Sequence, residues 1–434
     1  MTCTLPAILF LVVWWKRPVL KLRDLLLLLP FFAVGVAMGL STAWLEKSHV
    51  GAMGVDWDFG VAEKALIAGR VFWFYATKLL WPHPLIFVYE RWNVDTAVWW
   101  QYAFPAGFIG VTLAFWLLRR RIGKGPLVAV LFFAGTLLPA SGFFDVFPML
   151  FSFVADHFQY LASIGIIVLF CSTFVSFLDE ALASSWRRRG GLVVAAALLC
   201  FLGMLTWKRG PVFRNPETLW RDTMAQNPSA WIAYVNLGQY LGGAGRIEEA
   251  IECYREALRI RPETYRAHYD LAALLRAKGR TAQAAAHLLE VVRLETDHFE
   301  AHDRLGQMLV LEGRMDEAIP HFAASVRIEP RFARGRLDLG DALYAKGRIE
   351  EAVHQYREFL KLQPQVALVH NRLGLALEAQ GQPGAAIRHY RRALKLRPDL
   401  EEARENLSRL EARPGMAAEE RVAPEDSERG RAGP

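Results

Sequence analysis

The string GRIEEA occurs at residues 245–250 and again at 347–352, an interval of 102 residues or three units of 34. The same unit recurs between these copies, because a glycine and an alanine return every 34 residues. A strict period of this length is typical of arrays in which each unit is a helix pair that packs on its neighbours. The glycines are Gly245, Gly279, Gly313, Gly347 and Gly381, and the alanines are Ala250, Ala284, Ala318, Ala352 and Ala386.

Each unit matches the tetratricopeptide pattern, with a small residue in the first helix and an aromatic residue in the second. Small residues let two helices approach closely, so we expect the aromatic rings to fill the space against the next unit. We expect the turn glycines to adopt a backbone conformation that other residues avoid. The Leu-Gly pairs stand at 237–238, 305–306, 339–340 and 373–374, the rings are Tyr254, Phe322, Tyr356 and Tyr390, and the closing prolines are Pro262, Pro330, Pro364 and Pro398.

The second repeat departs from this pattern at four signature positions, which are Ala272, Leu288, Val291 and Thr296. We expect its fold to be preserved and its packing to be looser. The pattern predicts five repeats over residues 231–398, with a linker and N-terminal capping helix at 208–230 and a C-terminal capping helix at 399–412. Residues 413–434 are rich in charge, Pro and Gly, which predicts a disordered tail.

Residues 1–207 form a different domain, because long apolar runs replace the soluble pattern. A span needs about 20 apolar residues as helix. Runs of this kind predict spans at 25–45, 97–118, 126–144, 160–178 and 190–207. The expected fold class is therefore all-α, with a polytopic transmembrane helix bundle followed by a tetratricopeptide-repeat superhelix.

Basic clusters between the apolar runs predict the topology. WKRPVLKLR (15–23), RRRIGK (119–124) and WRRR (186–189) are typical of cytoplasmic loops. All three clusters lie on the same side of the membrane if the charged segment 62–81 does not cross it. We therefore expect this segment to lie in the lipid interface as an amphipathic helix. Whether 4–15 and 62–81 cross the membrane stays open. This topology predicts a multi-pass bacterial inner-membrane protein with periplasmic repeats.

The formal charge of +7 is accounted for by these clusters, so we expect no nucleic-acid partner. The cysteines, Cys3, Cys171, Cys200 and Cys253, predict neither a disulfide framework nor a metal site. His298 and His302 have the i,i+4 spacing of a helical metal site. However, His268, His302 and His370 share one repeat position, and His287, His321 and His389 share another. We therefore expect histidines that fill the scaffold, and no metal.

The groove formed by the first helices is the expected binding surface for an extended polypeptide, because its charged, amide and Tyr side chains suit a peptide backbone. A solvated face without a ligand is the alternative. The residues expected to face the groove are Arg266, Tyr269, Arg276, Asp303, Gln307, Arg334, Asp341, Tyr344, Asn371 and Glu378.

The predicted outer loops of the membrane domain hold a second set of candidates. Ionisable groups near the hydrocarbon are costly and tend to be functional. Arg70, Lys78, Arg91 and His157 are suited to binding a lipid phosphate, and Asp156 to orienting His157 or accepting a proton. Snorkelling of the cations and capping of a loop by Asp156 are the alternatives.

The segments GRVFWFYATKLLWPHPLIFVYERW (69–92) and FFDVFPMLFSFVADHFQYLASIG (143–165), followed by the repeats, resemble one protein family. This is the transmembrane and tetratricopeptide-repeat O-mannosyltransferase-like family, with its bacterial relatives. The resemblance implies a GT-C type glycosyltransferase that takes a sugar from a polyprenyl-phosphate carrier. It further implies that Arg70, Lys78, Arg91, Asp156, His157 and Tyr160 line the pocket for the carrier phosphate, and that the repeats hold the acceptor.

The same resemblance places the catalytic carboxylate in the first outer loop, whereas no acidic residue here precedes Asp24 in a basic loop. We therefore expect no catalytic residue and no resident cofactor in this chain, and a sequence that is truncated or part of a split protein. The expected function is recognition of an acceptor polypeptide for lipid-linked O-glycosylation, with membrane lipid and the polyprenyl-phosphate sugar as further partners. A non-enzymatic membrane-anchored scaffold for envelope proteins is the alternative.

Overall fold

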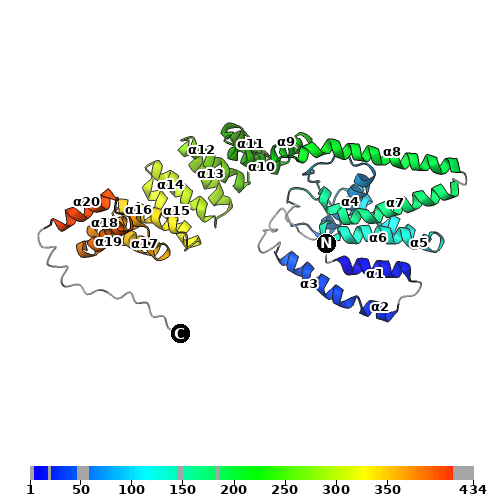
Figure 1. Cartoon of the computed structure of the whole chain (residues 1–434), viewed down its shortest axis with the longest axis horizontal. Coiled ribbons are helices and arrows are strands. Elements are labelled where there is room, and N and C mark those ends of the chain that lie inside the picture. The colour runs from blue at the N-terminus through cyan, green and yellow to red at the C-terminus, as the bar shows by residue number, and fades with distance from the viewer. Residues whose placement is uncertain (1–3, 18–20, 46–57, 144–149, 182–184, 414–434) are drawn as a thin grey trace. The chain divides into compact units, whose positions relative to one another are not determined.

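The computed structural model describes residues 4–17, 21–45, 58–143, 150–181 and 185–413 (Figure 1). Every regular element within these ranges is a helix, so the predicted all-α class is confirmed. The chain divides into two compact units, Met1–Ala244 and Gly245–Pro434, and each is described by itself. The predicted disordered tail lies outside the described residues from position 414 onward.

The first unit is organised around α4, whose inner face packs on α5 and α7. Val71 and Tyr75 of α4 are fully buried there together with Leu137 and Val154. The helices of this unit are α1 (Leu5–Lys16), α2 (Leu22–Leu26), α3 (Leu29–Leu45), α4 (Val61–Leu80), α5 (Ala103–Ile122), α6 (Gly125–Leu137), α7 (Tyr160–Ala181), α8 (Ser185–Arg209), α9 (Pro216–Gln226) and α10 (Trp231–Gly243). Short 3-10 turns lie at Trp99–Tyr102, Leu138–Ala140, Asp156–Gln159 and Gly210–Phe213.

The close approach of α4 to α5 depends on Gly69. A Cβ atom at this position would lie 2.5 Å from the backbone nitrogen of Pro105, so only glycine fits. The charged segment predicted at 62–81 is thus a helix with one face in the protein core. Its place in the lipid interface stays a prediction.

Two stretches of the described chain, Trp99–Ile122 and Val193–Phe213, are helical, long and apolar enough to cross a membrane. The helices at the other predicted spans form, but their apolar stretches cover only 29–42, 125–140 and 160–175. These are shorter than the roughly 20 residues that cross the hydrocarbon. The prediction of five spans is supported at two positions, and the polytopic bundle is not confirmed.

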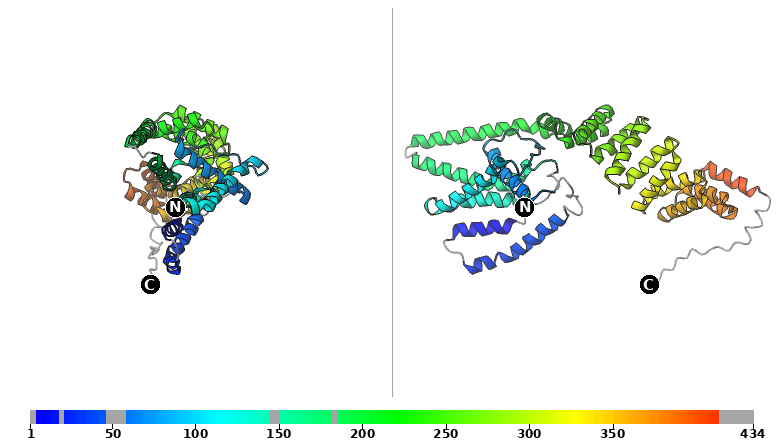
Figure 2. Two further views of the ribbon diagram at one scale, coloured as in Figure 1. Left: turned by 90° about the vertical axis from the view of Figure 1, so that its right-hand side faces the viewer. Right: turned by 180° about the vertical axis from the view of Figure 1, so that it is seen from behind.

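The second unit is a stack of helix pairs, visible from both sides in Figures 1 and 2. It begins with α11 (Ile247–Ile260), the second helix of the first repeat, and ends with α20 (Glu401–Glu411), the predicted capping helix. The pairs between them are α12 (Tyr265–Ala277) with α13 (Thr281–Leu294), α14 (Phe299–Leu311) with α15 (Met315–Ile328), α16 (Ala333–Ala345) with α17 (Ile349–Leu362), and α18 (Ala367–Ala379) with α19 (Pro383–Leu396).

The periodic glycines have the predicted backbone conformation. Gly245, Gly279, Gly313, Gly347 and Gly381 all have φ between +71° and +79°, a region where a side chain is strained. Each of them ends the turn between the two helices of a repeat, so the regular 34-residue spacing of these glycines follows from the geometry of the turn.

The rings of Phe322, Tyr356 and Tyr390 lie against the glycine of their own repeat. Tyr254 also reaches the next repeat, as expected for these aromatic residues, because its hydroxyl donates to Asp270 at 3.5 Å. A Cβ at Gly340 would lie 2.7 Å from the ring of Tyr356, and one at Gly374 would lie 2.5 Å from Tyr390. The second repeat has Ala272 and Leu288 at the corresponding positions, and both are buried. Ala272 is larger than the glycine of the other repeats, and Leu288 is smaller than their aromatic residue. The two changes compensate in volume, so the looser packing predicted there is not seen.

Candidate functional site

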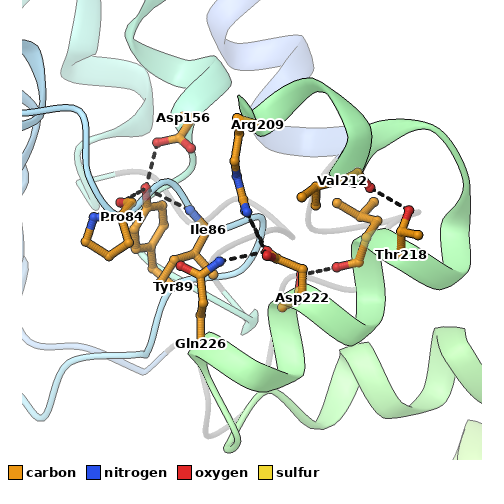
Figure 3. Close-up of polar contacts among 11 residues, drawn as sticks. Pro84, Ile86, Tyr89, Asp156, Arg209, Val212, Thr218, Asp222 and Gln226 are labelled. Carbon is orange, nitrogen blue, oxygen red and sulfur yellow. Dashed lines mark hydrogen bonds and ion pairs between the residues drawn. The ribbon is translucent and has the colours of Figure 1, made fainter. Parts of the chain in front are cut away.

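Tyr89 is the centre of a polar cluster in the loop that follows α4. Its hydroxyl donates to Oδ1 of Asp156 at 2.9 Å and accepts from the backbone N–H of Ile86 at 3.2 Å (Figure 3). Burial is the main cause that raises the pKa of Tyr89, so the hydroxyl stays protonated as a donor. The cluster therefore holds Asp156 at a defined position in the 3-10 turn that precedes α7.

Lys78 joins the same cluster from the last turn of α4. Its ammonium group donates to the carbonyl oxygen of Pro84 and lies 5.4 Å from the ring centroid of Tyr89. Tyr75, one turn earlier, exchanges two hydrogen bonds of 2.9 Å with the backbone of Ala155. Tyr89 thus contacts both Lys78, through its ring, and Asp156, through its hydroxyl, although these two residues are far apart in the sequence.

Arg70 and Arg91 are held by aromatic rings. The guanidinium of Arg70 lies 4.5 Å from the ring centroid of Trp92, and that of Arg91 lies 5.0 Å from Phe153. The two rings are themselves 6.0 Å apart. Aromatic contacts of this kind position a guanidinium, and a guanidinium is a bidentate donor suited to an anion.

The structure thus brings together four of the six residues predicted for the carrier pocket, in two neighbouring groups. Phe74 connects the groups, because its ring centroid lies 4.9 Å from that of Tyr89 and 5.9 Å from that of Trp92. Tyr160 is 73% exposed at the start of α7 and is not in either group. The side chain of His157 lies outside the described residues.

Sequence reasoning missed Tyr89 and Trp92, which organise the two groups. No signal marked them, because aromatic residues make up 12% of the chain and these two stand in a loop without periodicity.

The same loop is packed on α9 and α10. The side chain of Asn227 donates to the backbone carbonyl of Val88 at 3.1 Å, and the rings of Phe87 and Trp220 are in edge contact at 5.3 Å. The bidentate ion pair between Arg209 and Asp222, at 2.7 and 2.6 Å, fastens the end of α8 to α9 (Figure 3). The predicted N-terminal cap of the array is therefore anchored on the candidate site.

In the second unit, side-chain bonds between residues 31 apart connect successive first helices. Tyr269 donates to Glu300 at 3.1 Å, and Gln307 donates to Asp338 at 2.7 Å. Asp341 forms an ion pair with Arg372 in the same register. These contacts use the polar residues predicted for the groove, so the repeat scaffold and the predicted binding face share side chains.

A pocket of about 370 Å³ lies between α14 and α16 on this face. Three predicted groove residues, Arg276, Gln307 and Asp341, line it together with Asp338. The rest of its lining is apolar and consists of Met308, Val310, Leu311, Met315, Phe322 and Ala342. A pocket with an apolar floor and a charged rim is suited to an amphipathic side chain of a bound polypeptide.

Asp303 is a buried residue that bonds to Gln307, one of the residues that line this pocket. Its side chain is 3% exposed, and its Oδ2 accepts from Gln307 at 2.8 Å. Burial, followed by the charge of Asp338, raises the pKa of Asp303 to about 7. Near neutral pH this carboxyl group is therefore partly protonated and can donate as well as accept.

The remaining groove predictions divide between open and covered positions. Arg266 and Arg334 are exposed, and Tyr344 is half-buried. Asn371 is buried and donates to Glu402 of α20, while Glu378 forms ion pairs with Arg409 and Arg413. The capping helix thus occupies the last two predicted positions, and the open part of the groove runs over α12, α14 and α16.

The periodic histidines form pairs inside three repeats, as expected for a scaffold role. The Nδ1 atoms are 2.9 Å apart in His268–His287, 3.1 Å in His302–His321 and 3.0 Å in His370–His389. In the fourth repeat Arg336 and Gln355 take the same positions. His298 instead caps α14 by accepting from the N–H of Ala301 at 3.3 Å.

The tetratricopeptide-repeat family matches residues 217–263, 235–297 and 337–401 of the chain. The chain contains tetratricopeptide repeats. A second family, the bacterial transcriptional activator domain, matches residues 285–365 within the same array.

Curated relatives are protein O-mannosyl-transferases. Tmtc1 of Drosophila melanogaster is 36% identical over 128 residues, which are 29% of this chain and 14% of the relative. TMTC1 of Homo sapiens is 32% identical over 146 residues, or 33% of this chain and 16% of the relative. The matched part is thus a small fraction of the length of these relatives.

Among solved structures, the tetratricopeptide protein YrrB is 20% identical, with 43% of this chain and 96% of that chain covered and a TM-score of 0.41. MamA is 21% identical, with 40% and 94% covered and a TM-score of 0.37.

Proposed function

We propose that this chain is a membrane protein whose repeats bind an acceptor polypeptide for O-glycosylation from a polyprenyl-phosphate-linked sugar. The observation that carries the proposal is the pocket beside Gln307, which combines an apolar floor with a charged rim on the first helices of the array. The partial similarity to protein O-mannosyl-transferases supplies the reaction class. In this proposal the chain contributes recognition of the acceptor polypeptide.

The membrane location is supported by the surface of the two long apolar helices. Only 6% of the Trp99–Ile122 window and none of the Val193–Phe213 window is buried in the protein. Leu117 and Leu199 are 68% and 69% exposed on these helices. Apolar surface on this scale is stable in lipid and unfavourable in water.

The proposed orientation places the repeats on the periplasmic side of a bacterial inner membrane, in a multi-pass arrangement. The basic ends of the apolar helices support it, because Arg119, Arg120 and Arg121 form the last turn of α5. Lys208 and Arg209 at the end of α8 weaken the charge bias, and the ion pair of Arg209 with Asp222 neutralises one of them.

The carrier phosphate would lie beside Arg70, Lys78 and Arg91, with Asp156 held nearby by Tyr89. The stacked guanidinium groups offer bidentate donors, and the ammonium adds a point charge. The packing of this loop on the end of α9 joins the proposed donor site to the predicted N-terminal cap of the array within the first unit.

A photo-crosslinking residue at Arg276, which is exposed and lines the groove pocket, tests the proposal. The same residue at Leu289, which is 54% exposed on a second helix, is the matched control. We expect capture from Arg276 only, of a protein that carries O-linked sugar. Capture of that protein together with unchanged sugar occupancy after Arg91→Ala would favour the scaffold alternative.

A further inference from the structure

A cavity of about 980 Å³ lies between α1, α5, α6 and α7, away from the polar cluster of Tyr89. This volume is at the upper end of the range for small-molecule sites, roughly 300–1,000 Å³. Its lining is almost wholly apolar and consists of Val12, Trp15, Phe115, Ile122, Gly125, Pro126, Val128, Ala129, Phe132, Ile164, Gly165, Val168, Leu169, Phe170, Ser172 and Thr173.

The two hydroxyl side chains in this lining are already satisfied. Ser172 and Thr173 both donate to the backbone carbonyl of Leu169, at 3.0 and 2.8 Å. Neither hydroxyl therefore needs a partner in the cavity, and the walls are suited to a hydrocarbon chain.

One end of the cavity is strongly basic. Trp15, Ile122 and Gly125 line the cavity where α1 ends, α5 ends and α6 begins. Lys124 fastens these ends together, because its ammonium group donates to the carbonyl oxygens of Trp14 at 3.0 Å and Arg17 at 3.3 Å. The same turns carry Lys16, Arg119, Arg120 and Arg121.

This positive charge has no counterpart in the elements that carry it. The sequence contains no Asp or Glu in residues 1–23 or in residues 96–144. The sequence around the end of α7 and the start of α8 has two acidic residues, Asp179 and Glu180, and three basic ones, Arg187, Arg188 and Arg189. An anion at this end would therefore gain electrostatic energy, and the more so near the low-dielectric hydrocarbon.

We infer that this cavity binds an anionic phospholipid of the bilayer, with an acyl chain between the apolar walls and the phosphate at the basic end. An apolar chain joined to a negative head group matches both features, whereas a neutral lipid matches only the walls. The inference depends on the proposed membrane location. By that topology the basic end faces the cytoplasm, so the lipid is distinct from the sugar carrier proposed near Lys78 and Asp156.

The test uses the full chain reconstituted in nanodiscs that contain equal parts of phosphatidylglycerol and phosphatidylcholine, with the retained lipid measured by native mass spectrometry after release. We expect retention of phosphatidylglycerol in preference to phosphatidylcholine. Val168→Trp fills the cavity and should abolish retention. Ile167→Trp is the matched control, because Ile167 is 49% exposed on the same helix, against 51% for Val168, and does not line the cavity.

A second variant, Arg120→Gln with Arg121→Gln, leaves the walls intact and does not depend on the folding of the tryptophan variant. Removing two basic groups should lower the preference for phosphatidylglycerol by roughly thirtyfold. Three outcomes would overturn the inference. They are equal lipid retention in Val168→Trp and Ile167→Trp, no preference between the two lipids, and a polypeptide bound in the cavity. Carbonate extraction separates the two proposals: a chain released from membranes contradicts the membrane location, whereas a chain that stays without lipid preference contradicts only the lipid site.

Discussion

The side chain of Asn227, between α9 and α10, donates a hydrogen bond of 3.1 Å to the backbone carbonyl of Val88 in the loop after α4. Both residues are buried. The next residue along the loop is Tyr89, whose hydroxyl holds Asp156. One short segment thus joins the cap of the repeat array to the polar cluster proposed to receive the carrier phosphate.

Asn227→Ala should destabilise the first unit, because it leaves the buried Val88 carbonyl without its donor. The loss of unfolding free energy is expected to be about 1–3 kcal/mol, measured by denaturant unfolding in detergent. Asn93→Ala is the control, since Asn93 is exposed in the same loop, and its effect should stay below about 0.5 kcal/mol. Equal effects in the two variants would contradict an anchoring role for Asn227.

Tyr89→Phe removes the donor to Asp156 and keeps the aromatic contact with Lys78. We expect sugar transfer in membranes that contain the protein to fall, because Asp156 is then no longer fixed beside the cations. Tyr102→Phe is the control, since the Tyr102 hydroxyl bonds only to the exposed carbonyl of Thr96 among the bonds of the described residues. Normal transfer by Tyr89→Phe would place the cluster outside the function.

Gly340→Ala should destabilise the array, because the added methyl group would lie 2.7 Å from the ring of Tyr356. Overpacking of this kind costs about 1–3 kcal/mol. The double variant Gly340→Ala with Tyr356→Leu copies the Ala272 and Leu288 of the second repeat and should recover part of the loss. Thermal unfolding of the wild type and the two variants measures both effects, and a double variant less stable than the single one would exclude the compensation.

The sequence predicts the repeats well because the constraint there is local and periodic. Gly347 must have positive φ in its turn, and Gly340 must leave room for Tyr356, so both positions recur every 34 residues. The candidate site has no such period. Tyr89 acquires its role only when the fold brings it to Asp156, 67 residues away, and no local pattern encodes that contact.

The lengths of the predicted spans could not be derived from the sequence. Apolar composition identifies an apolar helix but not its length, which depends on where the backbone turns. In α6 the regular helix ends at Leu137, and a 3-10 turn with Pro139 follows. The apolar run therefore continues beyond the helix, and the predicted span at 126–144 is longer than the helix that forms.

The histidine pairs should make the array sensitive to acid. Burial, then the paired His370, then Arg357 and Arg388 lower the pKa of His389 from 6.5 to about 4. The unfolded chain therefore binds more protons than the folded chain between these values. Stability from this pair is fully present above pH 6.5 and is lost as the pH falls towards 4, by an amount on the order of 1–3 kcal/mol.

The chain itself supplies the control for this prediction. Arg336 donates to Gln355 at 3.3 Å and to the carbonyl oxygen of Pro330, and these residues occupy the positions of His370 and His389 in the preceding repeat. The variant His370→Arg with His389→Gln should keep the fold and remove this part of the pH dependence. Asp303 acts in the opposite direction over this range, since its raised pKa makes folding less favourable as the pH rises from 3.8 to about 7. The decisive quantity is therefore the difference in unfolding free energy between wild type and variant. A difference that does not change between pH 7 and pH 4 would show that the histidine pair does not set the acid sensitivity.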